Sequence, residues 1–145
     1  MSKERLYIFD TTLRDGAQTQ GVHFSIDEKT KIAHALDDLG VDYIEGGWPG
    51  ANPSDTEFFQ KGLELKNSTF TAFGMTKKAG RSADNDPGLS AILNSNTKSV
   101  CLVGKSWDFH VDVALGISKE ENLDNIKETT KPVSYTHLTL PTTVI

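Results

Sequence analysis

Four short apolar runs, separated by helical patterns, constrain the fold of this chain more than any other feature of its sequence. The runs cover residues 6–9, 43–44, 70–73 and 100–103, so that a new run begins about every 30 residues. Each follows a turn or a polar segment, which is typical of a buried strand. Strands that alternate with helices at this spacing run parallel, because each connection must return across the sheet.

The helical segments between these runs have recognisable starts. A hydroxyl and a carboxylate three residues apart form a capping box, and a capping side chain followed by proline also favours a helix start. These signals are Ser25 with Glu28, Asn52 with Pro53, Asp86 with Pro87, and Ser118 with Glu121. Gly40 supplies a C-cap for the first helix. The predicted order is therefore strand then helix, repeated four times.

This order fits two folds, an open doubly wound sheet and a (β/α)8 barrel. The glycine fingerprint of a dinucleotide site is absent after the first strand, where residues 10–16 read Asp-Thr-Thr-Leu-Arg-Asp-Gly. We therefore predict an α/β fold of the barrel type. A complete barrel needs about 250 residues, so the prediction is a partial (β/α)8 TIM barrel of about the first four βα units with parallel strands.

The predicted barrel segment covers residues 1–132, and residues 133–145 differ in character. They contain no Asp, Glu, Lys or Arg, and residues 133–138 resemble the translation of an adapter used to prepare DNA libraries. We therefore expect residues 133–145 to be a non-native tail. The alternative is a native β-rich tail, since Thr, Val, Ile and Tyr favour strands.

Charge and composition exclude several classes of function. The net charge of -5 gives no basic face for nucleic acid. No apolar stretch approaches the roughly 20 residues of a membrane span, so we expect a cytoplasmic protein with small-molecule substrates. The one cysteine, Cys101, lies in an apolar run, where a small buried side chain is expected.

Polar residues follow the first two strands, at the edge where a parallel barrel builds its active site. They are Asp10, Arg14, Asp15 and Gln18 after the first strand and Glu45 after the second. A carboxylate can bind a hard divalent cation, and a guanidinium can hold an oxyanion with two parallel hydrogen bonds. Two structural alternatives remain open: a local Arg14–Asp15 salt bridge, and a Glu45 carboxylate that caps the glycine-rich turn. The site hypothesis requires Asp10, Asp15 and Glu45 at one end of the sheet.

Three segments resemble a known superfamily. Residues 9–18, Phe-Asp-Thr-Thr-Leu-Arg-Asp-Gly-Ala-Gln, resemble the opening signature of metal-dependent condensing enzymes and lyases such as isopropylmalate synthase, homocitrate synthase and hydroxymethylglutaryl-CoA lyase. Residues 43–53 and 102–107 resemble the citramalate synthase branch of that superfamily. The resemblance covers residues 6–131.

The resemblance implies a reaction in which the methyl group of acetyl-CoA is deprotonated and attacks the keto carbon of pyruvate. It implies a divalent metal, Mg, Mn or Zn, that polarises the keto oxygen, and a parent enzyme that is a homodimer in isoleucine biosynthesis. By position, Asp15 matches the metal ligand, and Arg14 matches the catalytic arginine that also binds substrate. Gln18 matches a substrate-binding position and Glu45 a catalytic one.

The departures from the family pattern are equally informative. The family completes its metal site with a His-x-His pair, and none of His23, His34, His110 and His137 stands in that pattern. We therefore expect weak metal binding and no turnover by this chain alone. Two alternatives are a piece of a 2-isopropylmalate synthase and a non-catalytic half-barrel that binds a partner. Lys77, Lys78 and Arg81 are expected to form a solvated basic loop.

Overall fold

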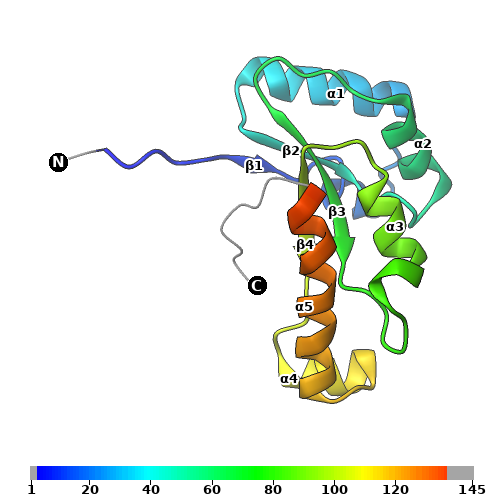
Figure 1. Ribbon diagram of the computed structural model, residues 1–145. Coiled ribbons are helices and arrows are strands. Elements are labelled where there is room, and N and C mark those ends of the chain that lie inside the picture. The colour runs from blue at the N-terminus through cyan, green and yellow to red at the C-terminus, as the bar shows by residue number, and fades with distance from the viewer. Residues whose placement is uncertain (1–2, 137–145) are drawn as a thin grey trace.

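The fold is a parallel four-stranded sheet with helical crossovers, as the sequence predicts. A computed structural model describes residues 3–136 (Figure 1). The strands are paired in chain order, β1-β2-β3-β4, and every pair is parallel. Their bounds are Phe9–Asp10 for β1, Tyr43–Gly47 for β2, Thr69–Met75 for β3 and Ser99–Val103 for β4. The described residues thus form about half of a (β/α)8 barrel.

The crossovers are helices that follow each strand. The long helices are α1 (Ile26–Leu39), α2 (Pro53–Lys61), α3 (Pro87–Leu93) and α5 (Lys119–Thr136). Short helical turns are η1 (Gly16–Gln18), η2 (Ala83–Asn85), α4 (Asp108–His110) and η3 (Val111–Leu115), the last a π-helical turn. Within residues 3–136, none of the helices combines the length and apolar character needed to cross a membrane.

The predicted helix starts are confirmed. The Ser25 hydroxyl accepts a hydrogen bond from the Glu28 amide, and the Glu28 carboxylate accepts one from the Ser25 amide. The Asn52 and Asp86 side chains cap α2 and α3 directly before their prolines. Gly40 ends α1 with a left-handed backbone, φ 87°. Each of these signals depends on residues close in sequence, which explains why they are readable without the fold.

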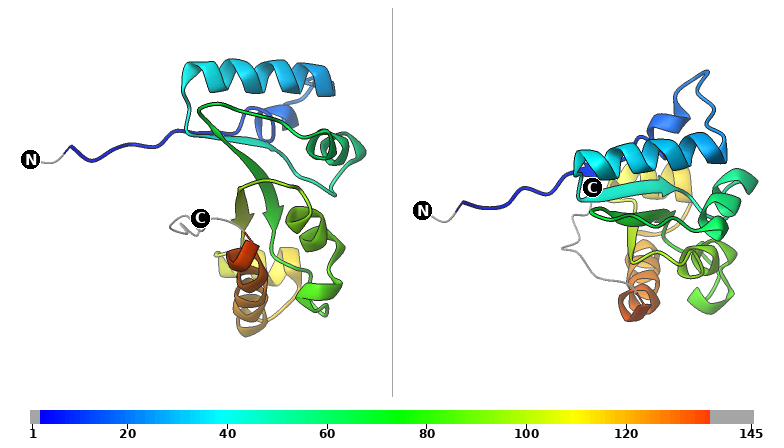
Figure 2. Two further views of the ribbon diagram at one scale, coloured as in Figure 1. Left: turned by 45° about the horizontal axis from the view of Figure 1, so that its top comes forward. Right: turned by 90° about the horizontal axis from the view of Figure 1, so that it is seen from above.

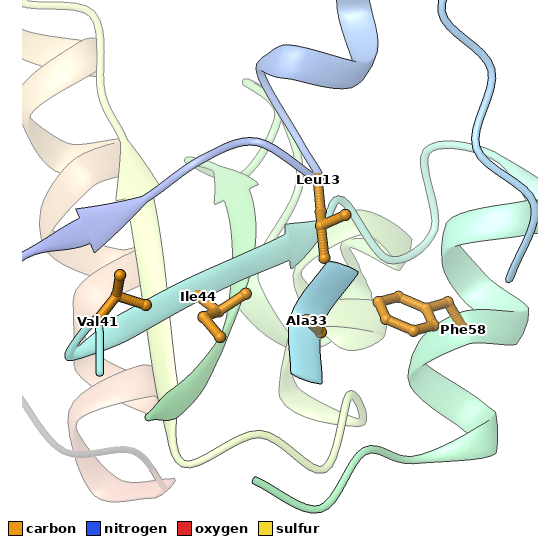
Figure 3. Close-up of a cluster of buried hydrophobic side chains, with 5 residues drawn as sticks. All are labelled: Leu13, Ala33, Val41, Ile44 and Phe58. Atoms are coloured by element: carbon orange, nitrogen blue, oxygen red, sulfur yellow. The ribbon is translucent and has the colours of Figure 1, made fainter. Parts of the chain in front are cut away.

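The principal core lies between the sheet and the first two helices. Figure 3 shows its buried side chains converging from the turn after β1, from α1, from β2 and its approach, and from α2. They are Leu13, Ala33, Val41, Ile44 and Phe58. Because Leu13 belongs to this core, the turn that carries Arg14 and Asp15 is anchored by a buried side chain.

The first apolar run is not the buried strand that the sequence predicts. Leu6, Tyr7 and Ile8 are 87%, 62% and 58% exposed, and only Phe9 and Asp10 form β1. The segment before β1 extends away from the body of the molecule in each view (Figures 1 and 2). The prediction of burial is wrong because, among the described residues, β1 pairs with β2 alone and no strand lies along its other edge.

Helix α5 contains the described part of the predicted tail, and a buried lysine contacts it. Residues 133–136 continue α5, and residues 137–145 of the tail lie outside the described residues. Lys77, expected in a solvated loop, is only 7% exposed. Its ammonium donates to Asn125 at 2.7 Å and pairs with Glu128 at 2.9 Å. The expectation is wrong for Lys77 because α5 covers the residues after β3.

Candidate functional site

The turn after β1 places the predicted site residues at the carboxyl end of the sheet. The Asp10 carboxylate accepts hydrogen bonds from the Thr12 amide and hydroxyl, at 2.9 and 3.1 Å. The Thr11 carbonyl then accepts hydrogen bonds from three consecutive amides, those of residues 14–16. Asp10 pairs in register with Ile44, one residue before Glu45. Asp10, Asp15 and Glu45 therefore lie around the carboxyl end of β1, although Glu45, expected after the second strand, is the third residue of β2.

The guanidinium of Arg14 is held on three sides. Its Nε donates to Glu45 Oε2 at 2.7 Å, and a terminal nitrogen lies 3.3 Å from the Asp15 carboxylate. Its carbon lies 4.2 Å from the centre of the Phe73 ring, a cation–π contact. The local Arg14–Asp15 salt bridge is therefore present, but it is the longer of two ion pairs. An arginine restrained in this way is oriented before any ligand arrives.

Glu45 is buried beneath Arg14. Its side chain has no exposed surface, and its second oxygen, Oε1, has no hydrogen-bond partner among the described residues. Burial raises the pKa of this carboxyl, and the hydrogen bond and charge of Arg14 oppose that rise. Glu45 does not cap the glycine-rich turn, so that alternative is wrong.

The thiol of Cys101 lies near Glu45 from β4. Burial, with the nearby carboxylate, raises the pKa of the thiol to about 11. Cys101 is partly buried, not fully buried as expected. At this pKa the thiol is protonated at neutral pH, so Cys101 is a neutral neighbour of Glu45.

The metal-ligand prediction for Asp15 is not tested by the arrangement. The Asp15 side chain is 64% exposed and its carboxylate can accept a cation. Within residues 3–136, however, no three His, Cys, Asp or Glu side chains come together as a metal-binding group. The described residues do not by themselves fit a divalent metal. Asp15 could contribute one ligand at most.

A surface pocket of about 250 Å³ lies beside Arg14. Gln18, expected to bind substrate, lines it together with Arg14. Lys29, Trp48 and Asp55 form part of the same lining. A ligand in this pocket would meet a guanidinium, an amide and an indole, which suits a small polar molecule with an apolar part.

The sequence analysis missed a buried ion pair on this pocket. The Lys29 ammonium donates to Asp55 Oδ1 and, at 3.0 Å, to the Gly46 carbonyl. The second Asp55 oxygen accepts the Trp48 amide at 2.9 Å. Lys29 falls on the apolar face of α1, four residues before Ala33 and four after Ser25. A charged residue at a core-facing helical position was the available signal.

The histidines differ in their surroundings. His34 is exposed, and His23 lines the pocket together with Arg14. Trp107 is 56% exposed and packs against His110, with ring centres 4.5 Å apart. His137 lies outside the described residues.

Several known proteins resemble this chain in sequence. Residues 5–140 match the family model described as HMGL-like. The chain is 50% identical over 128 residues to the (R)-citramalate synthase of Aquifex aeolicus, covering 87% of this chain and 24% of that protein. It is 36% identical over 132 residues to 2-isopropylmalate synthase 1 of Caldanaerobacter subterraneus, covering 90% of this chain and 32% of that protein. The chain thus spans about a quarter of the length of the citramalate synthases that it matches.

A solved structure shows the same fold. The crystal structure of an HMG-CoA lyase from Bacillus subtilis superposes with a TM-score of 0.72 at 21% identity. The superposition covers 94% of this chain and 45% of the lyase chain. At this identity the likeness concerns the fold alone, and it agrees with a partial barrel.

Proposed function

This chain belongs to the HMGL-like family, and on that premise we propose that it forms one part of the active site of an acyltransferase that condenses acetyl-CoA with pyruvate to give citramalate. The observation that carries the proposal is Arg14, held by Glu45 and Asp15 beside the pocket that Gln18 also lines. The 50% identity to a citramalate synthase supports the choice of reaction.

Each residue has a defined part in this proposal. Arg14 binds the substrate and stabilises the negative charge that develops on its keto oxygen, since a preorganised cation acts strongly in a site of low dielectric constant. Glu45 fixes the direction of the guanidinium, and the Gln18 amide donates to a substrate oxygen. Asp15 would contribute one ligand of a divalent metal, Mg, Mn or Zn, with the others supplied from outside the described residues. Such an ion would polarise the keto oxygen.

A second candidate is the 2-isopropylmalate synthase reaction, which uses a larger 2-oxoacid. The 36% identity to such an enzyme supports it less strongly than the 50% identity supports the first. We also propose that the chain by itself is inactive, because its described residues bring one metal-ligand candidate and no complete donor set.

A chimera tests the proposal. Residues 1–132 replace the matching segment of the Aquifex aeolicus citramalate synthase, and release of CoA is measured with pyruvate and with a bulkier branched 2-oxoacid. We expect pyruvate-dependent release, and a loss of kcat/KM on the order of 100-fold for Arg14→Lys, since lysine cannot reproduce the fork that meets Glu45. Arg81→Lys, an exposed arginine away from the pocket, is the matched control.

Three results would contradict parts of the proposal. A folded chimera that releases no CoA with either 2-oxoacid would contradict the proposed enzymatic activity. A preference for the bulkier acid would favour the 2-isopropylmalate synthase reaction. Equal loss in Arg14→Lys and Arg81→Lys would remove Arg14 from the active site.

A further inference from the structure

We propose that the buried Lys29–Asp55 ion pair is a positioning device. It fixes the position of Trp48, which forms one wall of the pocket, and through Trp48 it fixes the position of the Arg14 guanidinium. The inference rests on the proposed function only for its kinetic consequence. Its structural part concerns the chain itself.

The pair is buried and its polar atoms are occupied by the protein. The side chains of Lys29 and Asp55 are 4% and 13% exposed. The ammonium bonds to Asp55 and to the Gly46 carbonyl, and it lies 5.5 Å from the centre of the Phe58 ring. With these bonds in place, each charge already has a partner within the protein. The two residues therefore act through what they hold.

What they hold is the carboxyl end of β2 and the residue that follows it, Trp48. Lys29 donates a hydrogen bond to the Gly46 carbonyl, and Asp55 accepts one from the Trp48 amide. The pair therefore holds the backbone on both sides of Gly47. A Cβ on Gly47 would lie 2.7 Å from Asp55 Oδ2, and the backbone there has φ 147°. Glycine is required at this position because the carboxylate approaches the backbone so closely.

This segment is linked to Arg14 through two aromatic rings. The Trp48 ring meets the Phe73 ring edge-on, with centres 5.2 Å apart. Phe73 also contacts the Arg14 guanidinium, whose carbon lies 4.2 Å from its ring centre. Movement of Trp48 would therefore change both a wall of the pocket and the surface on which Arg14 rests. Such a chain of contacts becomes evidence of coupling only when it is tested.

The test combines a structural and a kinetic measurement. In the 145-residue chain, Trp107→Phe leaves Trp48 as the only tryptophan, so acrylamide quenching reports on Trp48 alone. We expect Lys29→Met to increase quenching of Trp48 and to shift the resonance of the Arg14 Nε–H. In the chimera described above, Lys29→Met should raise KM for pyruvate on the order of tenfold with a smaller fall in kcat. The reason is that a displaced Trp48 side chain would weaken the binding of pyruvate in the pocket. Lys29→Arg should restore much of the loss.

The matched control is a second ion pair between the same two helices. Lys61 of α2 lies 3.3 Å from Asp27 of α1, and both side chains are exposed. Lys61→Met should change neither the quenching nor KM. If Lys29→Met alone does not fold, the Lys29→Met/Asp55→Asn variant removes both charges and leaves none buried without a partner. It should show the same increase in Trp48 quenching.

The outcomes separate this inference from the proposed function. A lower melting temperature with unchanged Trp48 quenching, Arg14 resonance and KM would reduce the pair to a structural role and overturn the inference. A wild-type chimera without activity would overturn the proposed function. In that case the Trp48 and Arg14 measurements on the 145-residue chain still decide the inference.

Discussion

Asp37, near the end of α1, holds the segment that leads into β3 with one buried carboxylate. Its oxygens accept three backbone hydrogen bonds, from the amides of Lys66, Asn67 and Ser68, at 2.8, 2.8 and 2.7 Å. Burial acts to raise the pKa of Asp37, but these hydrogen bonds outweigh it and lower the pKa to about 2. The ionised carboxylate is therefore part of the folded structure.

Asp37→Asn should remove this stabilisation at neutral pH. A pKa lowered from 3.8 to about 2 corresponds to a contribution on the order of 2 kcal/mol. Because the folded pKa is the lower one, the contribution is complete above pH 4 or so and is lost as the pH falls towards about 2. The free energy of unfolding, measured by urea titration between pH 7 and pH 2.5, should differ most between the wild type and Asp37→Asn at neutral pH. The difference should shrink as acid is added.

Asp38 provides the control at the next position on α1. It is exposed, so Asp38→Asn should leave the urea midpoint almost unchanged across the same pH range. A difference between wild type and Asp37→Asn that stays constant with pH would show that the charge of Asp37 contributes nothing.

At the scale of elements, the contact of β3 with α3 depends on the absence of a side chain. Gly74 is buried in β3, and a Cβ placed there would overlap the Ile92 side chain of α3. Gly74→Ala should therefore destabilise the chain by about 1–3 kcal/mol, the usual cost of overpacking a core. Ile92→Val removes the atom nearest to that Cβ, so thermal unfolding of both single variants and the double variant should show that the two costs are not additive. If the two losses in the free energy of unfolding were strictly additive, α3 would be able to move away from the new Cβ, and the prediction would be wrong.

The elements themselves were largely predictable because their signals are local. The caps at Ser25, Asn52 and Asp86 and the end at Gly40 are written within a few residues of each helix terminus. The short helical turns over residues 108–115 were missed, because their start at Trp107 has no capping side chain. No local signal marks a helix start there.

The candidate site was predictable in location but not in its contacts. Parallel strands bring their carboxyl ends together, which placed Asp15 and Glu45 at one edge from sequence alone. That Arg14 pairs with Glu45, and that Lys29 pairs with Asp55, depends on side-chain packing between residues 31 and 26 positions apart. Lys77 was misjudged for the same reason, since its partners lie in α5.

At the scale of the whole molecule, the segment before β1 is the most exposed apolar region described. Leu6, Tyr7 and Ile8 are exposed and lead into β1, one edge of which has no strand partner among residues 3–136. The segment that they belong to extends away from the rest of the chain (Figure 2). A free strand edge with exposed apolar side chains is a template for association with another chain. We therefore expect the 145-residue chain to self-associate as its concentration rises.

Charges on that segment should suppress the association. Leu6→Lys/Ile8→Lys places two like charges on the same side of the extended segment, because side chains two residues apart share a face. Sedimentation velocity over a range of concentrations should show a smaller weight-average mass for this variant than for the wild type. Leu39→Lys changes another exposed leucine, 77% exposed at the end of α1, and should not alter the mass. Equal effects of the two variants would show that net charge, rather than the edge of β1, governs association. A wild-type chain that stays monomeric at every concentration would show that the prediction is wrong.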